Sequence, residues 1–136
     1  MNRENTRTLY QRYPRLFRGR EMSLQENLMP FGFECGNGWF KIIETLAAKI
    51  EAECQRLMAE EGLKEEDLPI AVQVKEKYGT LHFYMSRRSD AMTVAIREAE
   101  AKSAITCEQC GAPGTMSKGV WKSVACPAHK DAKTWK

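Results

Sequence analysis

Long hydrophobic runs are missing from this sequence. Although 43% of its 136 residues are hydrophobic, no apolar stretch approaches the ~20 residues that a membrane-spanning helix needs. The first 20 residues are also too polar to hold the apolar stretch of a secretory signal. We therefore expect a soluble, cytoplasmic protein with no membrane partner, in a compartment that keeps thiols reduced.

Histidine is scarce, and the glycine-rich motifs that bind nucleotides are missing. The two histidines are His82 and His129, and His82 is the one outside the C-terminal metal-ligand pattern. A general base would need an orienting acid and a substrate pocket, and the sequence identifies neither, so an exposed or packed hairpin histidine is the favoured interpretation and a catalytic one the alternative. The segment "CGNGW", residues 35–39, precedes a helical pattern, but no strand pattern comes before it and no Gly-Lys-Ser/Thr follows it. We interpret it as a tight turn into a helix rather than a phosphate site.

The sequence does contain five cysteines, an odd number that argues against complete disulfide pairing. In a reducing compartment they are expected to be metal ligands, nucleophiles or packing residues. Cys54 falls on the apolar side of a helical pattern and is interpreted as packing. Cys35 would be reactive only if a neighbour lowered its pKa.

Charge is unevenly distributed along the chain, whose formal net charge is +3. Residues 1–20 hold six arginines and one glutamate, residues 21–101 hold nine basic and fifteen acidic side chains, and residues 102–136 hold six lysines and two acids. The basic ends suit an anionic partner such as nucleic acid. They also fit the solvated surface of an ordinary protein, and charge alone does not choose between the two.

Hydrophobic periodicity predicts an α+β fold. Apolar residues recur at helical spacing from Asn37 to Glu61, which predicts a long amphipathic helix with Asn37 as its N-cap and Gly62 as its left-handed C-cap. The acidic residues of this helix are expected to face mostly water: Glu44, Glu51, Glu53, Glu60 and Glu61.

The rest of the core is predicted as a hairpin, a second helix and a short first helix. Residues 70–85 alternate on either side of a turn at Tyr78 and Gly79, with Ile70, Val72 and Val74 on one face. The second helix runs from about Ala91 to Ile105, capped by Ser89 or Asp90, and both helices pack on the hairpin. A short helix near the start is interrupted at Pro14, and an irregular stretch follows it through "MPFGFECGNG".

The C-terminal segment carries a metal-ligand pattern. Cys107, Cys110, Cys126 and His129 are spaced C-x2-C-x15-C-x2-H, in which each x2 pair can aim two side chains at one ion. Three cysteines and one histidine close a zinc tetrahedron, so one structural rather than catalytic Zn²⁺ per chain is predicted. The intervening residues predict two short strands, and Pro127 the start of a helix, as in a zinc ribbon or treble clef.

This pattern divides the chain into two parts. Residues 1–105 form the predicted α+β core with its basic N-terminal segment, and residues 106–136 form a zinc-binding module packed on that core as one unit. Self-association across the apolar residues Leu81, Phe83 and Met85 is a further option, and the oligomeric state is left open.

Two clusters of basic and aromatic residues are candidates for a binding surface, because arginine and aromatic rings can follow a phosphate backbone and stack on bases. The alternative for each is a solvated basic rim. The cluster around the hairpin comprises Lys75, Lys77, Tyr78, His82, Tyr84, Arg87 and Arg88. The cluster near the start comprises Arg12, Tyr13, Arg15, Arg18 and Arg20.

Several stretches together resemble a family of small, uncharacterised proteins of tailed phages and prophages. They are "LYQRYPRLFR", "FGFECGNGWFKII", "QVKEKYGTLHFYM" and the closing "AITCEQCGAPG" with "CPAH", and they span about residues 9–129. The resemblance implies a metal-bound phage product in the cytoplasm of a bacterial host. It implies no catalytic residues.

Three functions follow as hypotheses. The first is a non-enzymatic zinc-binding module that binds nucleic acid or a nucleic-acid-processing complex. The alternative is an inhibitor that blocks the surface of a host defence or transcription complex, and anti-defence activity belongs to this alternative. The third is a metal-dependent nuclease that uses His82.

Overall fold

The structure, a computed structural model, describes residues 1–130 and confirms the predicted α+β class. Its helices are α1 (Arg3–Arg12), α2 (Phe40–Glu61) and α3 (Asp90–Ser103), and short 3-10 helices occupy Arg18–Glu21, Met29–Phe31, Asn37–Trp39 and Glu65–Asp67. Within the described residues, no helix is both long and apolar enough to cross a membrane.

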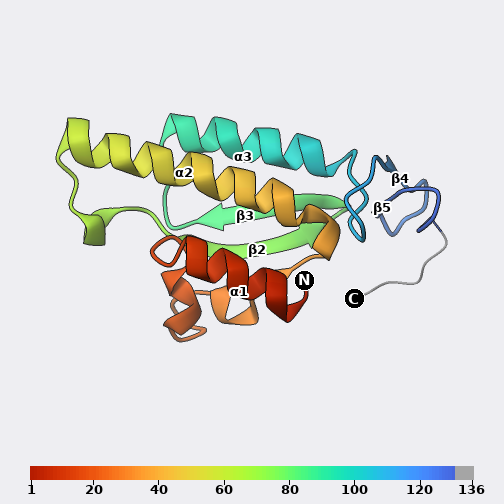
Figure 1. The fold of residues 1–136 in the computed structure, drawn as a ribbon, viewed down its shortest axis with the longest axis horizontal. Helices are drawn as coiled ribbons and strands as arrows, with labels where there is room; N and C mark the ends of the chain where they lie inside the picture. The colour runs from red at the N-terminus through yellow and green to blue at the C-terminus, as the bar shows by residue number, and fades with distance from the viewer. Residues whose placement is uncertain (131–136) are drawn as a thin grey trace.

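A three-stranded sheet lies beneath α2 and α3 in the view of Figure 1. The predicted hairpin is present as β2 (Ala71–Lys77) and β3 (Thr80–Met85), and β1 (Phe33–Glu34) pairs in parallel with β2. The prediction of an irregular stretch was wrong at β1. A strand of two residues has no alternation of its own, and it exists because Phe33 and Glu34 pair with Val74 and Lys75.

A register shift between Ala71 and Gln73 changes which β2 side chains face the core. Ala71 and Val74 are buried, whereas Val72 between them is only half-buried. The predicted common face of Ile70, Val72 and Val74 was therefore wrong, because the irregularity interrupts the two-residue alternation of a regular strand.

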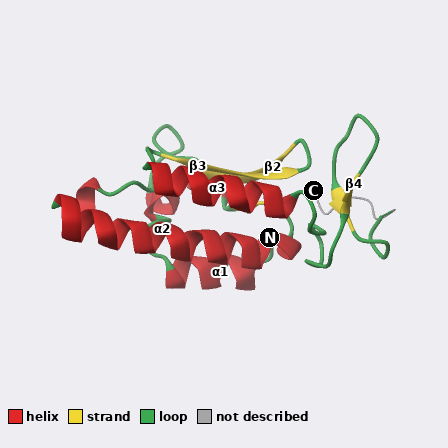
Figure 2. Cartoon of the chain, turned by 90° about the horizontal axis from the view of Figure 1, so that it is seen from above, coloured by secondary structure: helices red, strands yellow, loops and turns green. Residues whose placement is uncertain are grey.

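Helices α2 and α3 lie side by side, and α3 packs on β3 (Figures 1 and 2). Leu81 and Phe83 are 1% and 3% exposed in the resulting core. The apolar face that was a candidate for self-association is thus covered by the chain's own helices. Trp39, Ile43 and Ile50 fill the same core from α2 and the turn before it.

Two of the three predicted helix caps are present. Gly62 ends α2 with a left-handed φ of 69°, and the Ser89 hydroxyl accepts a hydrogen bond from the Met92 amide at the start of α3. Asn37 is not the N-cap of α2, because a 3-10 turn intervenes. Its side-chain oxygen accepts instead from the amide of Asn2, at 2.8 Å.

Glu53 is another departure, because it is 8% exposed rather than facing water. Its carboxylate accepts hydrogen bonds from Arg56 on the same helix and from the hydroxyl of Ser89. The partners compensate the cost of burying the charge, and the contact joins α2 to the N-terminus of α3.

Candidate metal centre and adjoining surface

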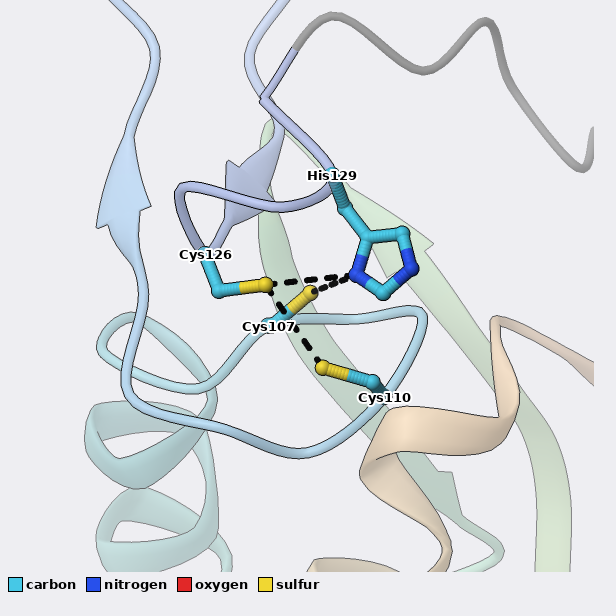
Figure 3. Close-up of side chains that lie close together, drawn as sticks. All are labelled: Cys107, Cys110, Cys126 and His129. Carbon is cyan, nitrogen blue, oxygen red and sulfur yellow. Dashed lines mark hydrogen bonds between the residues drawn. The ribbon is translucent and has the colours of Figure 1, made fainter.

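Four side chains from the two ends of the C-terminal segment converge on one point (Figure 3). Cys107 and Cys110 lie in the loop after α3, and Cys126 and His129 follow strand β5. Their ligand atoms all lie within 4.8 Å of one another, and this Cys3His cluster can hold a metal ion.

The separations match the size of a tetrahedral site. The Cys110 and Cys126 sulfurs are 3.6 Å apart, and His129 Nδ1 lies 3.2 Å from the Cys126 sulfur and 3.6 Å from that of Cys107. Around an ion with metal–sulfur bonds near 2.3 Å and metal–nitrogen bonds near 2.0 Å, tetrahedral geometry gives S–S and S–N separations of about 3.8 and 3.5 Å. The residues therefore fit such an ion.

Local turns hold both ligand pairs. The Cys107 carbonyl accepts from the Gly111 amide at 2.9 Å, with Gly111 at a φ of 84° that glycine adopts without strain. The His129 amide donates to the Cys126 carbonyl at 3.0 Å. The predicted strands are present as β4 (Thr115–Met116) and β5 (Val124–Ala125). Where a helix was predicted to start at Pro127, residues 127–130 form a turn, and the rest of the predicted helix falls on residues outside the described part of the chain.

The surroundings favour the thiolate form of Cys107. Burial by itself raises the pKa of this thiol, but hydrogen bonds from the backbone of Cys126, Cys110 and Gln109 outweigh burial and lower the pKa to about 6. A thiolate is the form that binds a metal ion.

The glycine-rich turn at residues 35–39 is where the Cys3His segment docks on the core. The Gly36 amide donates to the Glu108 carboxylate at 3.0 Å, and the Gly38 amide donates to the Glu108 carbonyl at 2.7 Å. The indole of Trp39 donates to the Thr106 carbonyl at 3.0 Å. The glycines themselves are the only local signal of this role in the sequence.

The glycines allow the two backbones to approach closely. A Cβ at Gly36 would lie 2.2 Å from the Glu108 carbonyl oxygen, and one at Gly38 would lie 2.0 Å from that of Cys107. Any larger residue would push the first ligand loop away from the core.

A second contact joins the segment to the far end of the sheet. A Cβ at Gly79, in the β2–β3 turn, would lie 2.4 Å from the sulfur of Met116 in β4 and 3.0 Å from the Cβ of Lys122. The two hairpins therefore touch, as the adjacent β2–β3 end and β4–β5 segment in Figure 1 suggest.

The face of the sheet opposite the buried side chains is polar. Lys75 pairs with Glu34 of β1 and with His82 of β3, so these residues share a row, and Gln73 and Tyr84 form the next row. None of these side chains is buried. The rings of His82 and Tyr84 stack at 6.0 Å with an angle of 23°, which presents a flat aromatic pair on this open face.

The predicted N-terminal cluster is engaged within the protein. Arg15 is only 12% exposed and bonds to the Pro69 carbonyl, the Glu51 carboxylate and the sulfur of Cys54. Arg12 pairs with Glu44. Arg18 donates to the Glu66 carbonyl, and Arg20 lies over the ring of Tyr10. Arg15 and Arg20 therefore have structural roles within the protein.

The last two candidates for the binding surface, Arg87 and Arg88, lie beyond the end of the hairpin. Arg87 and Arg88 follow β3 and are exposed, and Arg87 donates to the Asp67 carbonyl.

The two cysteines outside the Cys3His cluster are buried. Burial, followed by the carboxylate of Glu108, raises the pKa of Cys35 to about 12, which keeps this thiol protonated at neutral pH. Burial also raises the pKa of Cys54, in keeping with a packing role.

No protein-family model, curated protein or solved structure matches the chain. The chemistry of the residues above is therefore the basis for its function.

Proposed function

We propose that the protein is a non-enzymatic, zinc-stabilised module that binds nucleic acid or a complex that processes it. Zinc is the ion that best suits three thiolates and one imidazole at tetrahedral spacing. Four protein ligands leave no position for a reacting water, so the zinc is structural and fixes the loop that docks on Gly36 and Gly38. The zinc-ribbon or treble-clef description of this segment is part of the proposal.

The open face of the sheet is the observation that supports nucleic-acid binding. It carries the stacked His82–Tyr84 pair in register with Lys75, and the exposed Lys77 and Tyr78 continue it at the turn. Aromatic rings on a sheet surface can stack on unpaired bases, and lysines can contact phosphates. Glu34 is the acid on this face, and its carboxylate accepts from Gln73 at 3.1 Å.

The setting is also a proposal. The resemblance to small tailed-phage and prophage proteins and the reduced cysteines suit the cytoplasm of a bacterial host. A phage product that binds nucleic acid there would meet replicating, transcribed or packaged strands.

A salt titration tests the proposed function. The zinc-loaded protein is mixed with fluorescent DNA and RNA, and the affinity is measured between about 50 and 200 mM salt. Phosphate contacts by lysine predict an affinity that falls steeply over this range, and Lys75→Gln should reduce the slope. An exposed lysine outside this face, Lys64→Gln, is the control. Salt-independent binding, or none at all, would contradict the proposal.

A groove between α2 and α3 favours the alternative, an inhibitor that blocks a host complex. It has a volume of about 320 Å³ and is lined by apolar side chains and by three lysines, one of which, Lys49, pairs with Glu98 of the same lining. Its lining residues include Ile42, Leu46, Ala99, Lys41 and Lys102. An apolar segment with acidic flanks would suit it. Recovery of one stoichiometric host protein, lost on Leu46→Lys but kept on Lys75→Gln, would favour this function.

The nuclease hypothesis comes third. His82 Nε2 lies 3.2 Å from the Thr80 hydroxyl and its ring stacks on Tyr84, contacts that suit base stacking better than proton transfer. If a nuclease activity were detected and His82→Ala abolished it without loss of binding, this third function would replace the first.

A further inference from the structure

The tip of the β4–β5 hairpin exposes two large apolar side chains that the core does not use. Val120 and Trp121 are 92% and 90% exposed, higher than any other large hydrophobic side chain among residues 1–130. The zinc cluster does not need them, because the ligands lie at the other end of the hairpin. The exposed fractions therefore mark a feature that folding alone does not explain.

This tip has a defined conformation. The Ser117 hydroxyl donates to the Trp121 carbonyl at 2.9 Å and accepts from the Ser123 amide at 3.0 Å. The backbone of Ser117 and Ser123 is also bonded, at 2.8 Å. The backbone at Trp121 is thus held by a hydrogen-bonded loop, which lowers the backbone entropy lost when a ligand stacks on the exposed ring.

Tyr78 presents a second exposed ring on the neighbouring hairpin. It is 77% exposed and has a φ of 54°, a left-handed conformation that is uncommon for a bulky residue. Asparagine or glycine would suit this turn position better, and the exposed ring gains little by packing. Strained residues of this kind concentrate at functional sites.

The two rings flank a direct contact between the hairpins. Tyr78 precedes Gly79, and Trp121 precedes Lys122, the two residues that approach each other. In Figure 2 the loop beyond β4 extends past the end of the sheet on the side of the β2–β3 turn. The two tips together form one surface, here named the hairpin tips: Lys77, Tyr78, Lys118, Val120, Trp121 and Lys122.

The charge on the hairpin tips is positive. Lys77, Lys118 and Lys122 are exposed, and the Lys77 ammonium lies 5.7 Å from the centre of the Tyr78 ring. Residues 109–130 contain no acidic side chain, and Glu108 just before them is 2% exposed. On the β2–β3 side the Glu76 carboxylate accepts a hydrogen bond from the Gly79 amide at 2.8 Å, so three lysines face one carboxylate and the net charge stays positive. An anionic ligand is therefore favoured over an uncharged apolar ligand or a cationic one.

We propose that the hairpin tips bind single-stranded nucleic acid, with bases stacked on Trp121 and Tyr78 and phosphates beside the three lysines. The inference rests on the proposed nucleic-acid function and adds its substrate class. Bases in a duplex are stacked on one another, so exposed rings at two hairpin tips have full access only to unpaired bases. Because every base has a π face, sequence preference should be weak.

The test measures anisotropy of labelled single strands of about 12 nucleotides, as DNA and as RNA, and of the matched duplex. Single strands should bind more tightly than the duplex, and either sugar satisfies the inference. Trp121→Ala and Tyr78→Ala should each raise Kd by about 5- to 150-fold, and Trp121→Phe by less. Phe31→Ala, which removes an aromatic ring 58% exposed elsewhere, is the matched control and should not change Kd.

The outcomes separate the two proposals. Binding that survives Trp121→Ala and Tyr78→Ala, or that is equally tight for the duplex, overturns this inference and leaves the proposed function standing. Failure of the zinc-loaded protein to bind any nucleic acid at low salt overturns both. Zinc content and Tm are measured for each variant as a check on folding. Lys118→Gln removes a charge without changing a ring, and it should lower the slope of log affinity against log salt concentration for single strands by about 0.7.

Discussion

The Glu108 carboxylate accepts a hydrogen bond from the amide of Gly36, 72 positions earlier in the chain. Glu108 lies between Cys107 and Cys110, so the residue that docks on the core belongs to the loop that carries the first half of the Cys3His cluster. The same residue's carbonyl accepts from Gly38. Metal binding and the packing of the C-terminal segment are therefore expected to be coupled.

Gly38→Ala tests this docking. The new Cβ would lie 2.0 Å from the Cys107 carbonyl and 2.6 Å from the Gly111 amide, both of them backbone atoms that cannot rotate away. We expect a loss of about 1–3 kcal/mol or more in the free energy of unfolding, measured in urea, and weaker zinc binding. Gly119→Ala is the control, because a Cβ there meets nothing within 4 Å. Equal stability of the two variants would contradict the close approach.

Removing the metal should release the C-terminal segment before the core. Zinc binding in small modules contributes roughly 10–16 kcal/mol to folding, whereas α2, α3 and the sheet have their own buried core. If the Cys3His cluster holds the proposed zinc, chelation or Cys110→Ser should therefore reduce it from one ion per chain to none and abolish hydrogen-exchange protection in β4 and β5. The helices should keep most of their protection.

Cys54→Ala is the matched control for this experiment, because Cys54 is buried in α2 away from the cluster. It should keep its zinc while losing some stability. Full protection of β4 and β5 in a metal-free sample would show that the metal does not hold this segment.

The sequence predicted the features that depend on nearby residues. The two ligand pairs, the stripe of α2, the Ser89 cap and the Tyr78–Gly79 turn all involve residues a few positions apart, and spacing reveals them. It did not reveal features that depend on distant partners. Strand β1 exists through its pairing with β2. Glu53 is buried against Ser89, a hydrogen-bond partner 36 positions further along the chain. The role of Gly36 and Gly38 depends on Glu108, which no local pattern identifies.

Glu53 predicts a pH dependence of stability. Hydrogen bonds from Arg56 and then Ser89 hold its pKa below the ordinary 4.5, although burial opposes them. Since the folded pKa is the lower one, the stabilisation is complete above about pH 4.5 and is lost as the pH falls through the folded pKa. Near neutral pH, the free energy of unfolding measured in urea should be about 1–3 kcal/mol higher for the wild type than for Glu53→Gln.

That difference should shrink as the pH is lowered from about 7 to about 3. Glu60→Gln is the control, because Glu60 also bonds to Arg56 but its side chain is 62% exposed. Its difference from wild type should stay below about 0.5 kcal/mol throughout. A Glu53→Gln difference that did not change with pH would mean that the Glu53 charge contributes nothing.

Tyr78→Asn should stabilise the protein while weakening its binding to single strands. The left-handed φ of 54° costs a tyrosine about 1–2 kcal/mol, and asparagine before glycine is the preferred pair for such a hairpin turn. The loss of the exposed Lys77 contact offsets part of this, leaving a gain of about 0.5–1 kcal/mol. Tyr84→Asn, in the regular strand β3, should instead destabilise, because tyrosine suits a strand and asparagine does not. Urea unfolding of both variants decides this, and a loss of stability in Tyr78→Asn would show that the ring at this turn serves folding rather than a ligand.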